Sequence, residues 1–424
     1  MSSTMLSPDQ MTLEQILNIY LLNIQRGGRD GTSEMEFRFG TARGMKPISR
    51  IEYDNVVKRL LSAGFELGQQ NYLLRMNSEF TDPKSGVTRV SNIRAEVAGI
   101  GNVSEYCKSN DLDDMYSSRR VNFIQKGWQR LSDGPVRPVD VPDFNMRASL
   151  SLEKDLTTTQ LVKSMVSSWR DNKKQFRYIN RYKLTHKDIP VAVDVSIVKQ
   201  SARQGRNLAL TYTFQEAELD KQPERYEVEL EIDNFKVGIG TEYSTPEQLL
   251  LAVKRVVKLV LAGLQGTNYP VSYPEQNMVL ASYMQLLWGD KYREGQRVYP
   301  KNFVGPSSVS LQIKNIAPIN EDANIPNIRN GYTVTEKADG ERKLLYITDT
   351  GKIYLIDTNM NVQFTGAKTV RTELFNSLLD GEHIPHNKEK KFINLYAAFD
   401  IYYKNGEDLR KKAFMATEST QEVM

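Results

Sequence analysis

Glutamates repeat at every second position in two widely separated segments of this chain. The run at 34–39 has the sequence EMEFRF, and the run at 226–232 has the sequence YEVELEI. Because alternate side chains of a strand point to the same side, each run is predicted to be a strand with one charged and one apolar face. The charged faces hold Glu34, Glu36 and Arg38 in the first run and Glu227, Glu229 and Glu231 in the second.

These charged faces allow two interpretations. Either strand alone is most simply an ordinary half-buried strand with a solvated outer face. However, neighbouring like charges repel, so three successive glutamates on one face are costly without a counter-ion. A closed barrel with a polar interior resolves the conflict, because the glutamates then face inward onto a divalent cation. The apolar residues of the same strands then face outward, beneath covering helices.

The remaining pattern between the two runs is dominated by strand-like segments separated by turns. Besides the glutamate runs, strands are predicted at 72–80, 88–97, 119–129, 145–152, 176–185, 191–199 and 208–217. Helices are predicted at 13–24, 50–63, 158–169 and 246–264. So many strands in succession favour a mainly β fold, an antiparallel barrel with flanking helices, over an α/β sheet.

The composition restricts the chemistry of a metal site. Cys107 is the only cysteine, and the chain has only three histidines, so a cysteine-based zinc site and a histidine-rich centre are excluded. Any metal must be held by oxygen ligands, which favours Mg²⁺ or Mn²⁺. The absence of a signal-like N-terminus and of long apolar runs favours a reducing, cytoplasmic location without membrane contact.

Basic residues that could hold an anion lie on the strands between the glutamate runs. Arg177, Arg181 and Lys183 occupy odd positions of one predicted strand and therefore share a face. Arginine suits bidentate contact with phosphate, and lysine supplies a point charge. Singly, each such residue is most often a solvated surface residue. Further candidates on other strands are Arg94, Arg147 and Lys199.

The two glutamate runs, in this order and with basic strands between them, resemble the triphosphate-tunnel metalloenzymes. The resemblance covers roughly residues 10–265, and the family includes the RNA 5′-triphosphatases of fungi, protists and large DNA viruses. It implies that Glu34, Glu36 and Glu231 ligate the metal, while Glu227 and Glu229 complete the acidic floor and position water. It also implies that the substrate triphosphate is bound by Arg38, Arg94, Arg177, Arg181, Lys183 and Lys199.

A change of composition separates this region from the rest of the chain. The segment 263–274 is rich in glycine and proline and is predicted to be a linker, which divides the chain into domains at 1–266 and 267–424. A helix is predicted at 276–288 and a loop at 303–311. A second β-rich region is predicted to begin at residue 331.

A lysine motif opens this second region. Residues 337–342 have the sequence KADGER, between predicted strands at 331–336 and 343–348, and a hairpin continues into 352–357. The motif is short enough to be a surface turn. With its flanking strands it resembles the nucleophile motif of covalent nucleotidyltransferases, which include capping guanylyltransferases and ATP-dependent ligases. The resemblance implies that Lys337 attacks the α-phosphate of the nucleotide, GTP in a capping enzyme, and that Arg342 contacts the ribose.

Two later segments agree with this family in order. Residues 379–382, LDGE, resemble its acidic motif, in which Glu382 serves nucleotide or metal. Residues 398–401, AFDI, resemble the next motif, with Asp400 as a carboxylate of the metal site. The alternatives are a plain hairpin turn for the first segment and a strand-end charge for the second. The family's later motifs do not occur before Met424, and residues 416–424 are predicted to be a polar tail.

The sequence therefore predicts a barrel followed by a partial, ATP-grasp-like nucleotidyltransferase domain, as in the capping enzymes of large DNA viruses. The 5′-diphosphate end made by one domain is the acceptor for the next, which favours mRNA capping. The expected partners are the 5′-triphosphate end of RNA, GTP and a cap methyltransferase domain or subunit, and the expected location is a viral factory or virion. The alternatives are an inorganic or nucleoside triphosphatase, a ligase, a fragment of a longer enzyme, or a non-catalytic subunit.

Overall fold

The chain divides into two compact units, residues 1–266 and 267–424, in a computed structural model. The structure describes residues 11–25, 33–40, 46–81, 85–132, 134–205, 207–319, 325–334 and 337–414. The predicted polar tail at 416–424 lies outside the described residues. No helix among the described residues is long and apolar enough to cross a membrane.

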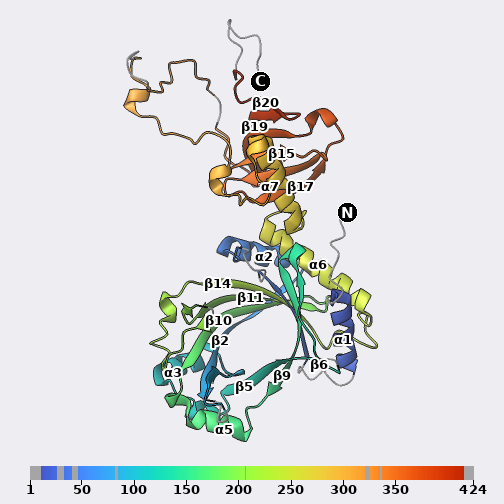
Figure 1. The fold of residues 1–424 in the computed structure, drawn as a ribbon, viewed down its shortest axis with the longest axis vertical. Coiled ribbons are helices and arrows are strands. Elements are labelled where there is room, and N and C mark those ends of the chain that lie inside the picture. The colour runs from blue at the N-terminus through green and yellow to red at the C-terminus, as the bar shows by residue number, and fades with distance from the viewer. Residues whose placement is uncertain are drawn as a thin grey trace. The chain divides into compact units, whose positions relative to one another are not determined.

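The first unit is built around a closed ring of eight strands (Figure 1). In order around the ring these are β1 (Ser33–Phe39), β14 (Arg225–Ile232), β11 (Val191–Gln200), β10 (Lys174–Thr185), β2 (Glu66–Thr81), β4 (Ile93–Ala98), β5 (Val121–Trp128) and β9 (Met146–Asp155). The pairing of β9 with β1 closes the ring, and all eight pairings are antiparallel. The predicted fold class, a mainly β antiparallel barrel with flanking helices, is confirmed.

Short strands extend this ring at its edges. β3 (Thr88–Val90) pairs with β2, and β8 (Val139–Val141) pairs with β9. Two small hairpins lie outside the main sheet: β6 (Arg130–Leu131) with β7 (Gly134–Pro135), and β12 (Arg203–Gln204) with β13 (Asn207–Leu208).

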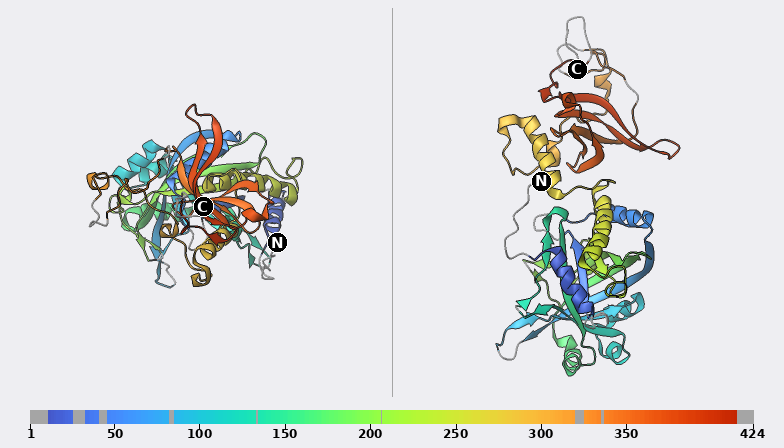
Figure 2. Two further views of the ribbon diagram at one scale, coloured as in Figure 1. Left: turned by 90° about the horizontal axis from the view of Figure 1, so that it is seen from above. Right: turned by 90° about the vertical axis from the view of Figure 1, so that its right-hand side faces the viewer.

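Helices cover the outer face of the two glutamate strands. α1 (Leu13–Gln25) and α6 (Pro246–Gln265) lie side by side there, as Figure 2 shows, and α2 (Arg50–Ser62) packs against α6. The outward residues of the strands are fully buried, Met35 and Phe37 on β1 and Val228 and Leu230 on β14 all being 0% exposed. The apolar half of the alternating pattern thus forms core, as predicted.

The ends of α2 and α6 follow from local sequence. Ser49 and Thr245 close capping boxes with the side chains of Glu52 and Gln248, and Gly266 ends α6 in the left-handed conformation. Gly263 belongs to α6 and not to the predicted linker. A Cβ atom there would lie 2.5 Å from the Cα of Val56, so the glycine lets α6 approach α2 closely.

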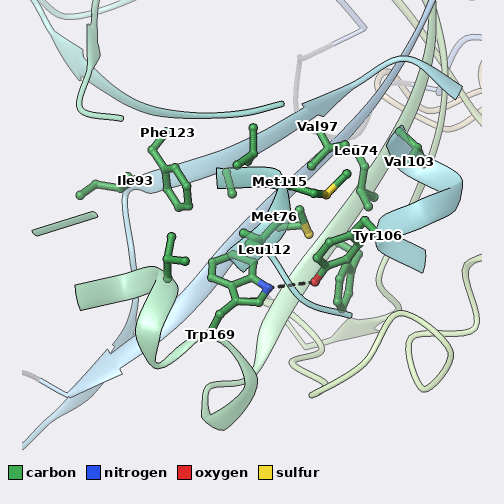
Figure 3. Packing of buried hydrophobic residues seen from close by; sticks show 14 of the residues in the cluster. Leu74, Met76, Ile93, Val97, Val103, Tyr106, Leu112, Met115, Phe123 and Trp169 are labelled. Carbon is green, nitrogen blue, oxygen red and sulfur yellow. Dashed lines mark hydrogen bonds between the residues drawn. The ribbon is translucent and has the colours of Figure 1, made fainter. Parts of the chain in front are cut away.

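A second apolar core lies beneath three helices on another side of the barrel (Figure 3). These helices are α3 (Ile100–Ser109), α4 (Asp113–Ser117) and α5 (Gln160–Ser167). At the centre, Trp169 is 1% exposed and its Nε1 donates to the Tyr106 hydroxyl at 3.1 Å. Of the three helices only α5 was predicted.

The strand predicted at 208–217 is wrong beyond residue 208. Its sequence alternates like a strand, but the backbone turns after β13, and Ala217 and Phe214 pack into the core of Figure 3. Phe214 N donates to the side chain of Asn110 at 2.7 Å, which holds the segment beside α3. Tertiary packing has overridden the local strand preference.

The second unit contains a six-stranded antiparallel sheet with one helix, α7 (Tyr273–Trp288), packed against it. The strand order is β17 (Val362–Lys368), β16 (Lys352–Asp357), β15 (Glu341–Ile347), β18 (Ser377–His386), β19 (Phe392–Lys404) and β20 (Glu407–Asp408). The predicted hairpin from β15 to β16 is confirmed. Residues 331–334 do not form the predicted strand, and residues 335–336 lie outside the described part.

Candidate active site

The interior of the barrel is a polar cavity of about 630 Å³. Charged side chains from all eight ring strands line it, so its walls carry both signs of charge. Its charged lining residues are Glu34, Glu36, Arg38, Arg75, Arg94, Lys126, Arg147, Glu153, Arg177, Arg181, Asp194, Glu229 and Glu231.

The two glutamate strands are direct neighbours in the ring. β1 pairs with β14 so that Glu36 lies opposite Glu231 and Arg38 lies opposite Glu229. These side chains share the inner face, and Glu229 is only 7% exposed. The two runs, nearly 200 positions apart in the chain, thus form one continuous acidic wall. Of the predicted glutamates, the structure brings Glu34, Glu36, Glu229 and Glu231 together on the wall of the cavity.

A lysine that the sequence analysis missed lies between the first two glutamates. The Nζ of Lys126, from β5, lies 2.8 Å from Glu34 Oε2 and 2.7 Å from Glu36 Oε1. Burial, reinforced by Glu153 and Glu36, raises the pKa of Glu34 to about 7 although Lys126 opposes the shift. For Glu36, burial also acts to raise the pKa, but the Lys126 ammonium outweighs it and the pKa is lowered.

The predicted basic face of β10 points at the second glutamate strand. Lys183 Nζ lies 2.7 Å from Glu231, and Arg177 forms an ion pair with Glu227. Arg181 reaches Asp194 Oδ2 of β11 at 2.8 Å, and Glu229 at 3.6 Å. Each of the three glutamates on β14 therefore has a cationic partner on β10, because these cations share one face of that strand.

Asp194 is a further carboxylate that the sequence analysis missed. It is 4% exposed, and burial raises its pKa to about 6 although Arg181 and Lys183 oppose the shift. It stands in the run VAVDVSIV, which looks like a strand buried on both faces, so only the single charge in an apolar run marks it.

A chain of alternating charges follows the opposite wall. Arg94 contacts Glu153 at 2.7 Å and Glu96 at 2.6 Å, and Arg75 contacts Glu96 at 2.6 Å. Arg94 was a predicted phosphate ligand, but the other three residues were missed. The alternation of Arg94 and Glu96 on one strand was the available signal for Glu96.

Two of the predicted cations stand apart from this network. Lys199 lies on β11 at an odd position, whereas Asp194 and Ser196 show that even positions of this strand face the cavity. Its Nζ donates to the backbone carbonyl of Asp220 at 2.9 Å. The structure therefore removes Lys199 from the predicted substrate-binding set. Arg147 lines the cavity but pairs with the exposed Asp140 at 2.7 Å.

Some polar atoms of the cavity wall have no protein partner. Among the described residues, Arg177 Nε, Asp194 Oδ1 and Ser151 Oγ are buried without a hydrogen bond. Buried polar atoms normally find partners, and all three residues line the cavity. The wall is therefore suited to a polar ligand or to water.

The predicted metal ligands are neighbours, but cations separate them. Within the described part of the chain, no three carboxylate, imidazole or thiol side chains stand close enough together to hold a metal ion. Glu34 and Glu36 are held by Lys126, and Glu231 is held by Lys183. The donor set nevertheless fits Mg²⁺ or Mn²⁺, because it consists only of carboxylate oxygens on adjacent strands, with a cation already between two of them.

The lysine motif of the second unit lies just before β15. Lys337 is exposed, and its Nζ donates to the carbonyl of its neighbour Ala338 at 3.1 Å. The motif is tied to β18, because the amide of Gly340 donates to Glu382 Oε2 at 3.0 Å. Residues 379–382 lie within β18, so the alternative of a hairpin turn is excluded.

Arg342 is held by a carboxylate that was not among the predicted site residues. Its Nε and one terminal nitrogen contact Asp380 at 3.1 and 2.5 Å, and the fully buried Asp380 also accepts from the Tyr402 hydroxyl at 2.6 Å. The other terminal nitrogen donates to the Pro306 carbonyl at 2.6 Å. Asp400 lies opposite Asp380 in the sheet, and burial raises its pKa.

Residues 264–418 match the family model for the catalytic domain of mRNA capping enzymes. The predicted resemblance to the capping enzymes of large DNA viruses is supported further by a probable mRNA-capping enzyme of Acanthamoeba polyphaga mimivirus, which is 31% identical over 188 residues.

The matches to these capping enzymes cover only part of each protein. The mimivirus match covers 44% of this chain and 13% of that protein. An mRNA-capping enzyme of Danio rerio is 32% identical over 111 residues, which are 25% of this chain and 17% of that protein. The chain thus spans well under a fifth of the length of these relatives.

Solved structures similar to this chain include two triphosphatases. The mimivirus capping enzyme triphosphatase has a TM-score of 0.38 at 14% identity and covers 59% of this chain and 98% of its own. An RNA triphosphatase of S. pombe has a TM-score of 0.35 at 12% identity and covers 61% of this chain and 96% of its own.

Proposed function

We propose that this chain acts in mRNA capping, and that its barrel removes the γ-phosphate from the 5′-triphosphate end of RNA. The observation that carries the proposal is the pairing of β1 with β14, which joins two glutamate runs into one wall opposite the cations of β10. The relationship of residues 264–418 to capping enzymes gives RNA priority over other triphosphates as the substrate.

The residues of the cavity divide between anion and cation binding. Arg177, Arg181, Lys183 and Arg94 supply positive charge to the triphosphate, and the planar guanidinium groups suit bidentate contact with its oxygens. Arg38 lies next to Glu229 at the same wall and adds to this set. Holding the phosphate chain in a fixed direction is a large part of catalysis in phosphoryl transfer.

The acidic wall would hold the divalent cation and the attacking water. Glu34, Glu36 and Glu231 would ligate Mg²⁺ or Mn²⁺, which when bound neutralises the charge of the γ-phosphate oxygens. Glu227 and Glu229 orient the water. The water oxygen bonds to the γ-phosphorus, the bond from that phosphorus to the β,γ-bridging oxygen breaks, and the products are inorganic phosphate and a 5′-diphosphate RNA end.

The second unit would serve the next step, in which GMP is transferred to the diphosphate end. Lys337 is exposed and therefore accessible to GTP, and its amine would attack the α-phosphorus to form lysyl-GMP and release pyrophosphate. Glu382 holds the motif loop through Gly340, which positions it beside β18. In this proposal a cap methyltransferase domain or subunit is a further partner.

The test of the triphosphatase is release of labelled phosphate from γ-labelled triphosphate RNA in the presence of Mn²⁺. The wild-type chain should release phosphate, and Glu36→Ala should lower the rate by about a hundredfold or more, because a metal ligand is lost. Lys199→Ala is the matched control, since its side chain lies outside the cavity, and it should retain the rate. Unchanged release by Glu36→Ala would exclude the acidic wall as the active site.

Two comparisons separate the alternatives. Inorganic tripolyphosphate, offered in place of RNA, identifies a general triphosphatase if it is hydrolysed at least as well. Incubation with α-labelled GTP or ATP tests the second unit, because a covalent adduct that is lost in Lys337→Ala identifies the nucleophile. An adduct with ATP alone would favour a ligase.

A further inference from the structure

Among the described lysines, Lys126 is the one that contacts two of the proposed metal ligands. It comes from β5, which does not pair with β1, and it reaches across the cavity wall to Glu34 at 2.8 Å and Glu36 at 2.7 Å. Its side chain is 31% exposed and lines the cavity, so it is accessible from the interior. The ammonium therefore occupies the place between two carboxylates where a divalent cation would bind.

A lysine ammonium and a divalent cation cannot share these two carboxylates. Like charges a few ångströms apart repel strongly in a partly desolvated site, and Lys126 already occupies one oxygen of each carboxylate. A lysine side chain has four rotatable methylene bonds, so its ammonium can move while the backbone of β5 stays in place. Binding of the metal must therefore displace the ammonium from Glu34 and Glu36.

The structure also provides a place for the displaced ammonium. Glu153 Oε1 lies 3.6 Å from Lys126 Nζ, on the strand that pairs with β5, where Lys126 and Glu153 are opposite each other. Glu153 is already paired with Arg94, one of the proposed phosphate ligands, at 2.7 Å. An ammonium that turns from Glu36 toward Glu153 competes with Arg94 for that carboxylate and frees positive charge for an anion in the cavity.

We propose that Lys126 is an exchangeable counter-ion, which holds the acidic wall together without metal and is displaced when a divalent cation binds. The proposal rests on the function proposed above and adds to it a residue that sets metal affinity. In the metal-free protein Lys126 offsets the repulsion between Glu34 and Glu36. In the loaded protein its ammonium turns to Glu153, which frees Arg94 for the phosphate chain.

Binding of Mn²⁺ to the full chain without substrate tests the exchange by titration calorimetry. Lys126→Met removes the competing charge and should tighten Mn²⁺ binding by about tenfold or more. Lys126→Gln, which keeps a polar side chain, should tighten it in the same direction. Lys199→Met is the matched control outside the cavity and should bind as wild type does. Far-ultraviolet circular dichroism establishes that each variant is folded.

The outcomes separate this proposal from the function on which it rests. If Glu36→Ala abolishes Mn²⁺ binding but both Lys126 variants bind as wild type or more weakly, the exchange is refuted and the metal site stands. If the wild-type chain binds no Mn²⁺, both proposals are overturned. Tighter binding in both Lys126 variants, lost again when Glu36→Ala is added, supports the exchange.

Discussion

The pair formed by Arg342 and Asp380 allows a quantitative test of how the lysine motif is anchored. Asp380 has no exposed surface and receives two contacts from Arg342 and one from Tyr402. Arg342→Met keeps an unbranched apolar stem beside Phe303 but leaves a buried carboxylate with one neutral donor. Removing one partner of a buried ion pair costs about 3–5 kcal/mol, so this much stability of the second unit should be lost.

The same unit contains a matched control. Arg410 also contacts an aspartate through two nitrogens, at 2.9 and 2.6 Å from Asp408, but here the side chains are 36% and 38% exposed. Exposed pairs contribute at most about 1 kcal/mol, so Arg410→Met should have a small effect. The two ion pairs have nearly the same contact geometry, so the difference between them is how deeply their side chains are buried.

Hydrogen exchange of the amides of β15 and β18 in the full chain measures the opening free energy of this sheet directly. Adding Asp380→Asn to Arg342→Met should restore more than half of the loss, because the uncompensated charge is then gone while Tyr402 keeps an acceptor. Equal losses in Arg342→Met and Arg410→Met would refute the argument from burial. If both losses are small, Arg342 remains available as a ribose contact without a structural role.

Three further predictions concern the barrel and are measured by urea unfolding. The pKa of Glu34 is raised to about 7, so the folded state binds more protons than the unfolded state between about pH 4.5 and 7. The free energy of unfolding therefore falls as the pH rises through this range. Glu34→Gln should remove this loss and stabilise the barrel by about 1–2 kcal/mol at pH 8. Burial lowers the pKa of Lys174 to about 8, so stability should rise between about pH 8 and 10, and Lys174→Met should abolish the rise. Phe37→Ala should cost about 3–5 kcal/mol, because the ring is 0% exposed, whereas the exposed Phe235→Ala should be nearly neutral.

The glutamate strands and the basic face of β10 were predictable because alternation along a strand is a local property. A repeat of two fixes which side chains share a face, whatever the strand pairs with. Met35 and Phe37 were therefore assigned correctly to the outer core, together with Val228 and Leu230. Which strands are neighbours in the ring could not be predicted in this way, because β1 and β14 pair although they lie at opposite ends of the barrel sequence.

The missed residues are those whose role depends on that non-local order. Lys126 is a single charge in the run VNFIQKGW and acquires its partners only because β5 lies two places from β1 around the ring. Asp194 is hidden in an apolar run, and Glu153 is a single carboxylate at the end of the alternating run MRASLSLE. Lys199 was wrongly assigned to the substrate site, because a single charge in a strand does not reveal whether it faces the interior of the barrel.

In the second unit, the motif drew attention to Glu382 and away from Asp380, two positions earlier. Both lie on β18 opposite β15, but Glu382 faces the exposed motif loop and Asp380 faces the core beside Tyr402. A motif identifies which residues belong to a site, whereas burial decides which of them act as anchors. Only the packed structure distinguishes the two.

The balance of charge in the barrel explains why metal and phosphate should bind together. Of the described residues that line the cavity, seven are cationic and six are carboxylates, and most are paired with each other. A triphosphate alone would have to take Arg181 from Asp194 and leave that buried carboxylate without its cation. A divalent cation alone would leave the released ammonium of Lys126 without its two partners. When both bind, the metal satisfies the carboxylates and the phosphates satisfy the cations, so each ligand lowers the cost of binding the other.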